Sequence, residues 1–253
     1  MSSDALPDVK STERALAEAL AKTGFPFEYQ VFSHFKADGW STSSNRLYVD
    51  VEEEKTREMD LLCYKAARGA FQTTYTVVLI SCKARHNKPW VLLTREWPAL
   101  PPGSYPYPPV PVWTNHPVLA YELGRSSWGK DYFDLAEATG LSRWAADSPR
   151  EVFALQEFEP AKQDTSGKTA TPAKFNPKGD SSLYEGTMSL LKALVYETTA
   201  VKGRRAGSGE RFVYQFNLVQ LLDGDLYEAA FGGEAEPRVR KVDRYRYFAR
   251  TML

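Results

Sequence analysis

The chain has 253 residues, of which 43% are hydrophobic and 25% are charged. This length and this apolar content allow a substantial core, so a chain that is disordered throughout is excluded. Lysine and arginine together number 32, and so do aspartate and glutamate. The chain is therefore not the strongly basic body that by itself would indicate nucleic-acid binding, and any such affinity must come from local patches.

The N-terminus and the cysteines bear on where the protein works. The chain begins Met1-Ser-Ser-Asp-Ala, without the basic start and apolar core of a signal peptide, and it has no run of about 18 apolar residues that could span a bilayer. Cys63 and Cys82 are too few for a disulfide framework or a cysteine-rich zinc site. These features predict a soluble, cytoplasmic protein.

Two helices are predicted near the N-terminus. They cover residues 11 to 22 and 26 to 38, are separated by Gly24, and the second begins with Pro26, which suits a first helical position. One apolar stripe on the second helix consists of Phe27, Val31 and Phe35.

Three strands are predicted next. Residues 47 to 51 alternate weakly, and stronger strand patterns follow at 58 to 65 and at 73 to 83. The third strand contains Val77-Val78-Leu79-Ile80, which is apolar on both faces. That pattern is typical of a central strand covered on two sides.

Residues 84 to 180 have a different composition. Seven prolines between residues 98 and 111 exclude regular hydrogen-bonded structure there and predict a connector. A helix at 128 to 139 and a strand at 151 to 158 are expected to follow. Residues 160 to 180 are rich in Lys, Thr, Pro, Gly and Ser, which predicts a loop.

Regular structure is predicted again in the C-terminal quarter. A helix from 182 to 198 would begin with the capping-box pair Ser182 and Glu185. Two strands would then flank Asp223-Gly224-Asp225, which indicates a hairpin turn. The three C-terminal strands are predicted at 211 to 222, at 226 to 231 and at 239 to 250.

One group of polar side chains converges on the predicted hairpin of the second and third strands. Paired positions in an antiparallel hairpin have a constant sum, so a turn near residues 70 to 72 brings Asp60 next to the segment from Ser81 to Lys83. Ser81 and Lys83 are two residues apart and share a face. The sequence thus predicts a carboxylate, a hydroxyl and an ammonium group at one end of the hairpin.

Two of the carboxylates have more than one explanation. Asp60 lies in an apolar strand and needs a partner, because an unpaired buried charge costs several kcal/mol or more. Three arrangements would stabilise its charge: a bound divalent metal ion, a salt bridge to Lys83, or exposure to solvent at the strand end. Glu28 borders the apolar stripe of the second helix, and its ordinary role there is a favourable interaction with the helix dipole.

Three segments together resemble the PD-(D/E)xK nuclease superfamily, specifically its restriction-endonuclease-like and Mrr-like branches. The segment from Gly24 to Trp40 is similar to that superfamily's helix with an early glutamate and a Gly-Trp end. Arg57-Glu-Met-Asp60-Leu-Leu62 is similar to its strand with the metal-binding aspartate, and the segment from Val77 to Lys83 to its apolar strand ending in (D/E)xK. The match covers about a third of the chain, and Ser81 stands where the motif usually has Asp or Glu.

The resemblance implies an α/β (α+β) fold with a restriction-endonuclease-like αβββαβ core, in which helices flank a mixed central sheet. Residues 11 to 83 and 181 to 253 would form this core within a single domain. Residues of about 84 to 180 would be a long insertion, rich in proline and aromatic residues, that contains a subdomain of its own.

The resemblance also implies a metal site. A Mg²⁺ or Mn²⁺ ion would be bound by Asp60, by Glu28 directly or through water, and by the carbonyl of Cys82, since oxygen ligands suit these hard ions. The ion would activate a water, and Lys83 would orient that water or neutralise developing charge. Ser81 would hydrogen-bond nearby. Glu58 is a reserve acid, with surface pairing as its ordinary role.

Local basic clusters predict contacts with nucleic-acid phosphates. The residues concerned are Arg85, Lys88, Lys202, Arg204 and Arg205. A further basic group between residues 238 and 250 is explained equally well as charge that protects a strand edge. The aromatic residues of the insertion would bind unpaired bases or a protein partner, or would simply pack together.

Three functions are compatible with these patterns. The first is metal-dependent hydrolysis of phosphodiesters by an endonuclease, with DNA favoured over RNA as the substrate. Such an enzyme would act in restriction or another form of defence, and a homodimer would suit the cutting of both strands. The second is a catalytically silent nuclease-like module for nucleic-acid binding or assembly, which the replacement at Ser81 allows. The third is a hydrolase with Ser81 as nucleophile and Lys83 as base, although Ser81 lies within a strand and not in a nucleophile elbow.

Overall fold

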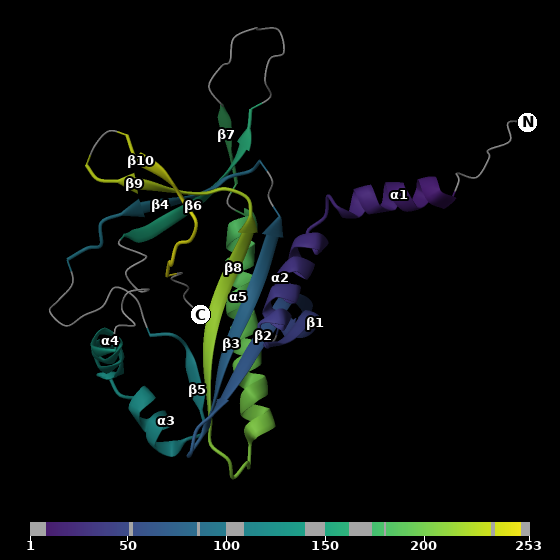
Figure 1. The fold of residues 1–253 in the computed structure, drawn as a ribbon. Helices are drawn as coiled ribbons and strands as arrows, with labels where there is room; N and C mark the ends of the chain where they lie inside the picture. Colours follow the sequence, from purple (N-terminus) through teal and green to yellow (C-terminus); the bar gives the residue numbers. More distant parts are fainter. Residues whose placement is uncertain are drawn as a thin grey trace, which may run out of the picture.

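A computed structural model describes most of the chain. The described residues are 9–50, 53–84, 87–99, 109–139, 150–161, 174–179, 181–233 and 236–248. They form a mixed α/β structure with five helices and two mixed five-stranded sheets (Figure 1). The mixed α/β class predicted from the sequence is therefore confirmed. Within the described residues, no helix is long and apolar enough to cross a membrane.

The first sheet has the strand order β1-β2-β3-β8-β5. Strands β1, β2 and β3 are consecutive and antiparallel, β3 and β8 are parallel, and the short β5 pairs antiparallel with β8. Their bounds are Ser41–Asp50, Lys55–Arg68, Thr73–Ala84, Phe212–Asp223 for β8 and Val112–Thr114 for β5. The central strands are longer than their sequence patterns predict because pairing continues beyond the apolar residues.

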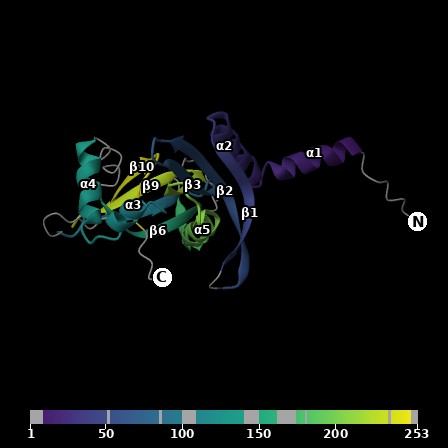
Figure 2. The same ribbon diagram turned by 90° about the horizontal axis from the view of Figure 1, so that it is seen from below.

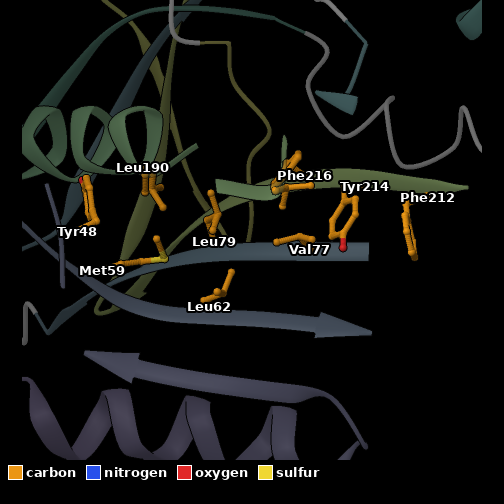
Figure 3. Packing of buried hydrophobic residues seen from close by; sticks show 11 residues of the cluster. Tyr48, Met59, Leu62, Val77, Leu79, Leu190, Phe212, Tyr214 and Phe216 are labelled. Atoms are coloured by element: carbon orange, nitrogen blue, oxygen red, sulfur yellow. The ribbon is translucent and has the colours of Figure 1, made fainter. Parts of the chain in front are cut away.

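Helices cover both faces of this sheet (Figure 2). On one face, Val78 and Ile80 of β3 pack with residues of α2, which spans Phe25–Ala37. On the other face, Val77 and Leu79 pack in a cluster that includes residues of α5, which spans Ser181–Arg205; Figure 3 shows this cluster. The apolar character of β3 on both faces thus corresponds to burial on both faces.

Gly39 sets the direction in which the chain leaves α2. Its φ of 76° lies in the left-handed region, which costs glycine little. This conformation allows the N–H of Trp40 to bond to the carbonyl of Phe35 at 3.0 Å, a typical helix end that satisfies a terminal carbonyl. The chain then enters β1 directly at Ser41.

The second sheet has the order β10-β9-β4-β6-β7 and combines the insertion with the C-terminal strands. The bounds are Trp90–Arg95 for β4, Glu151–Pro160 for β6, Phe175–Lys178 for β7, Leu226–Phe231 for β9 and Arg238–Val242 for β10. The insertion therefore does not fold on itself alone. Its strand β5 joins the first sheet, and its other strands pair with one another and with β9.

The three remaining helices do not belong to the pair that covers the first sheet. They are α1 at Val9–Leu20, α3 at Pro117–Leu123 and α4 at Trp128–Ala138. Helix α1 extends away from the rest of the described structure (Figure 1). The predicted helices at 11 to 22 and 128 to 139 agree with α1 and α4 to within a few residues, as expected for helix ends.

Asp223-Gly224-Asp225 is not a hairpin turn, contrary to the prediction from sequence. Strands β8 and β9 on either side of it belong to different sheets, because β8 pairs with β3 and β5 whereas β9 pairs with β4 and β10. The segment is a corner at which the chain passes from the first sheet to the second. The same flexible turn residues serve both purposes, and only the wider packing distinguishes them.

Other local predictions also differ from the structure. The last strand, predicted at 239 to 250, is β10 and ends at Val242. Residues 175 to 178, predicted as loop, form the edge strand β7, which pairs with β6 through its backbone and does not depend on apolar side chains. Helix α5 begins at Ser181, and the hydroxyl of Ser182 donates to the carboxylate of Glu157 instead of capping the helix. Most of the remaining predicted loop lies outside the described residues.

Candidate functional site

The end of the β2–β3 ladder carries the candidate site. Paired residues run from Arg68 with Thr73 to Leu61 with Ile80. One step beyond this last pair lie Asp60 and Ser81. Strands that stop pairing at this point leave backbone and side-chain groups free to converge, and the polar residues predicted from the sequence occur here.

Asp60 is held against β3 by a backbone hydrogen bond. The N–H of Cys82 donates to Oδ2 of Asp60 at 2.7 Å. This short bond to a charged acceptor belongs to the stronger class of hydrogen bonds. Among the described residues, the partner of the Asp60 carboxylate is therefore this N–H and not the ammonium group of Lys83, so the salt bridge considered from the sequence is not formed.

Glu28 reaches the same region from the first turn of α2. Burial is the main cause that raises the pKa of its carboxyl, and the negative charges of Asp60 and Glu58 raise it further, while Lys83 opposes them. A carboxylate that is destabilised by burial and by a second carboxylate is suited to a nearby cation. The structure thus brings Glu28, Asp60 and Lys83 into one electrostatic neighbourhood.

Ser81 and Lys83 come from the last residues of β3. Ser81 is 5% exposed, and Lys83 is half-buried. The stem of Lys83 lies close to α5, since a Cβ atom added at Gly186 would be 3.5 Å from Cε of Lys83. The side chains of Ser81 and Lys83 therefore leave β3 on the face of the sheet that α5 covers, opposite to α2, as the two-residue spacing requires. The charge of Lys83 acts on Glu28 around the end of the strand.

Cys82 contributes its backbone more than its side chain. The side chain is buried in the cluster that includes residues of α2. Burial, followed by the charges of Asp60 and Glu28, raises the pKa of the thiol to about 12. The thiol therefore stays protonated at neutral pH and is a poor metal ligand, because thiol ligands bind as thiolates. The sequence prediction assigns the carbonyl of this residue, and not its thiol, to a metal.

The available donors fit a hard divalent cation. They are two carboxylates, from Asp60 and Glu28, and the carbonyl oxygen of Cys82. Mg²⁺ is commonly held by one or two carboxylates and keeps several waters. No group of three or more His, Cys, Asp or Glu side chains suited to a metal occurs among the described residues, so the fit rests on this smaller oxygen set.

Glu58 has a partner that its sequence context does not indicate. The amide of Asn45 on β1 donates to Oε1 of Glu58 at 2.6 Å, and Glu58 itself is exposed. Asn45 has a φ of 50°, in the left-handed region that asparagine tolerates better than most residues. Glu58 is thus held by a side chain of β1, and its charge influences Glu28.

The predicted basic residues fall in two regions of the structure. Lys88 is half-buried in the connection from β3 to β4, while Arg85 lies outside the described residues. Lys202, Arg204 and Arg205 are at the C-terminal end of α5, next to the beginning of β8. Phe212 at that beginning pairs with Thr73, ten residues before Lys83, which corresponds to about 33 Å along the strand.

Both arginines at this end of α5 have intramolecular partners. Arg204 contacts the carboxylate of Glu197 at 3.4 Å. Arg205 donates to the hydroxyls of Tyr75 and Tyr214 at 3.3 and 2.8 Å, and its guanidinium lies 3.9 Å from the ring centre of Phe212. The Arg205 side chain therefore packs against the end of the first sheet where β3 and β8 begin.

Sequence reasoning missed three residues beside the site. They are Gly186 of α5, Gln220 of β8 and Tyr247 after β10. Gln220 pairs in register with Ser81, a relationship visible only once β8 is known to be the parallel neighbour of β3. No local motif marks these residues.

Comparison of the chain with models of known families, with curated proteins and with solved structures found no match.

Proposed function

We propose that the protein is a metal-dependent nuclease that hydrolyses phosphodiester bonds, with DNA as the preferred substrate. The observation that carries the proposal is the position of Asp60 at the end of the β2–β3 ladder, bonded to the N–H of Cys82 and electrostatically coupled to Glu28. Lys83 lies on the same strand end and completes a group of two carboxylates, one carbonyl and one ammonium.

The order of elements around this group supports the proposal. Helix α2 precedes the antiparallel strands β1, β2 and β3, and α5 leads into β8, which is parallel to β3. This order of elements supports the αβββαβ core that the sequence resemblance implies. In this proposal, the residues between β3 and α5 are the long insertion expected from the sequence.

Asp60, Glu28 and the carbonyl of Cys82 would hold a Mg²⁺ or Mn²⁺ ion. When bound, such an ion supplies an activated water at neutral pH and stabilises negative charge on phosphoryl oxygens. Lys83 would orient the attacking water or balance the charge that develops on the phosphate. Ser81 replaces an acid that would add a negative ligand, so the charge of Glu28 becomes more important to the site.

The buried position of Ser81 favours this chemistry over a Ser-Lys hydrolase. Its side chain is 5% exposed and lies within a paired strand. A serine nucleophile has to be accessible to a substrate carbonyl and to lie next to donors for an oxyanion. Ser81 is better suited to hydrogen bonding inside the site.

Cleavage of supercoiled plasmid and of single-stranded DNA, each with Mg²⁺ or Mn²⁺, tests the proposal. Asp60→Asn, Glu28→Gln and Lys83→Gln are each expected to lower the rate by about 100-fold or more, as for other groups that stabilise developing charge. Glu137→Gln is the control at an exposed position on α4, away from the site, and should cut at the wild-type rate.

Two outcomes would reject the proposal. Equal cleavage by the wild type and by Asp60→Asn would assign the activity to something other than this site. A wild type that binds DNA, does not cut it and takes up no metal in calorimetry would instead support the catalytically silent module.

A further inference from the structure

Gly186 makes room for two side chains under α5. A Cβ atom at this position would lie 1.9 Å from Nε2 of Gln220 and 3.5 Å from Cε of Lys83. The first distance is shorter than any contact that real atoms tolerate, whereas the second is an ordinary van der Waals contact. The missing side chain therefore allows the Gln220 amide to lie against the helix beside the stem of Lys83.

Gln220 is anchored on both sides of its amide. Nε2 donates to the carbonyl of Leu183 at 3.2 Å, and Oε1 accepts from the hydroxyl of Tyr247 at 3.4 Å. The hydroxyls of Tyr247 and Thr187 lie 2.7 Å apart, within hydrogen-bonding distance. These bonds join three segments that are distant in sequence: the beginning of α5, the end of β8 and the residues after β10.

Tyr247 is suited to a structural bond. Burial is the main cause that raises the pKa of its hydroxyl, so the group stays neutral and keeps its proton for donation. Deletion of such a hydroxyl leaves its partners without their hydrogen bond in a partly buried environment, and the Gln220 amide then loses one of its two anchors.

Lys83 depends on this packing for its position. In the described part of the chain, its ammonium group has no ion pair and no hydrogen bond. A long lysine stem without a polar partner is positioned by the surfaces that it contacts, because its rotamers are otherwise free. That surface includes the bare backbone of α5 at Gly186, and the amide of Gln220 lies beside it.

We infer that Gly186, Gln220 and Tyr247 form a positioning network that holds the Lys83 side chain at the end of β3 that carries the candidate site. Gly186 supplies the space, Gln220 fills the volume next to the lysine stem, and Tyr247 fixes the Gln220 amide from the C-terminal segment. The catalytic consequence rests on the proposed function. The effect on the Lys83 side chain does not, and it can be measured in the absence of activity.

The main test compares two glycine variants of the same helix. In Gly186→Ala the new methyl group must displace Gln220, whereas Gly203→Ala is a matched control because a Cβ atom there meets nothing within 4 Å. The protein is labelled with ¹³Cε lysine, and the Lys83 signal is assigned from its loss in Lys83→Arg. Cleavage kinetics are measured on the same samples.

We expect Gly186→Ala to move the Lys83 ¹³Cε signal and to lower kcat by about 10- to 100-fold with little change in KM, since small misplacements of a catalytic group have effects of this size. Gly203→Ala should leave both unchanged. A Lys83 signal in Gly186→Ala that coincides with that of the wild type overturns the inference, whether or not the protein cuts DNA.

A tyrosine pair keeps the test decisive if Gly186→Ala does not fold. Tyr247→Phe removes only the hydroxyl that anchors Gln220 and should move the Lys83 signal in the same direction. Tyr245→Phe removes a hydroxyl that bonds to Glu228 and to the carbonyl of Arg150 in another part of the molecule, so it should not. An unmoved Lys83 signal in Tyr247→Phe also overturns the inference.

The measurements separate this inference from the proposed function. A wild type without cleavage, together with a Lys83 signal that moves in Gly186→Ala, would leave the positioning network standing and reject the nuclease. The opposite result is also possible: cleavage needs Asp60, but the Lys83 signal and kcat are unchanged in Gly186→Ala and Tyr247→Phe. That result would support the nuclease and reject the positioning network.

Discussion

Oδ2 of Asp60 accepts a hydrogen bond of 2.7 Å from the backbone N–H of Cys82. The bond crosses from β2 to β3 one step after their last paired residues, Leu61 and Ile80. It continues the ladder with a side chain in place of a carbonyl. Because an ionised carboxylate has about four acceptor positions, the same group can hold the strand end together and still bind a cation.

This bond predicts a difference between two substitutions of Asp60. Asp60→Ala leaves the N–H of Cys82, a buried residue, without its acceptor, and we expect a loss of about 1–3 kcal/mol in the free energy of unfolding. Asp60→Asn keeps an oxygen in place and should lose less. Urea denaturation monitored by tryptophan fluorescence measures both values. Equal stability of the two variants would mean that the bond contributes nothing.

Glu28 predicts a pH dependence of stability. Its folded-state pKa is raised, first by burial and then by Asp60, so its contribution is fully present below the unfolded pKa of about 4.3 and is lost as the pH rises through the folded value. Glu28→Gln does not titrate. In the absence of divalent metal, the stability of this variant relative to the wild type should therefore increase between about pH 4 and pH 7.

Denaturation curves across this pH range check the expectation for Glu28. Glu137→Gln, an exposed carboxylate on α4, is the control and should follow the wild type throughout. A difference between Glu28→Gln and the wild type that falls as the pH rises would contradict the sign of the pKa shift.

Metal binding should stabilise the wild type and not the site variants. An ion that binds only the folded state at about 100 times its Kd adds about 2.7 kcal/mol to the free energy of unfolding. We expect Mn²⁺ to raise the Tm of the wild type and of Glu137→Gln, and to have little effect on Asp60→Asn. The same rise in Asp60→Asn would locate the ion elsewhere.

Arg205 should matter for stability and not for DNA. Arg205→Lys loses the planar contact with Phe212 and the paired bonds to Tyr75 and Tyr214, so the free energy of unfolding should fall by about 1–2 kcal/mol. Cleavage and DNA affinity should stay unchanged. Lys88→Gln, in the connection that follows β3, should instead weaken DNA binding. Arg205→Lys keeps the positive charge, so a reduced DNA affinity in this variant would indicate that this end of α5 contacts DNA after all.

The second sheet has its own buried charge. Glu228 is 1% exposed, and Thr94 donates to it at 3.0 Å. Thr94→Val removes this bond to a charged group and should cost about 1.5–3 kcal/mol, whereas Thr94→Ser keeps the hydroxyl and should cost less. Thermal denaturation distinguishes them. Cleavage rates of folded Thr94→Val should match the wild type, because neither residue belongs to the candidate site.

Local pattern was sufficient for the elements that meet at Asp60 and Lys83. The apolar run from Val77 to Ile80, a turn after Arg68 and the constant sum of hairpin pairs fix the register of β2 and β3 to within a residue. These interactions connect residues close in sequence, so strand propensity and turn position already determine them. The same holds for the beginning of α2 at Gly24 and Pro26.

Tertiary packing alone decided the rest of the site and of the fold. Asp223-Gly224-Asp225 suits a hairpin and a corner equally. Which of the two forms depends on the strands with which β8 and β9 can pair through their backbones. Gly186 and Gln220 become neighbours only because α5 crosses the sheet where β8 lies parallel to β3. Such contacts are set by burial across the whole molecule, for which a single stretch of sequence has no signal.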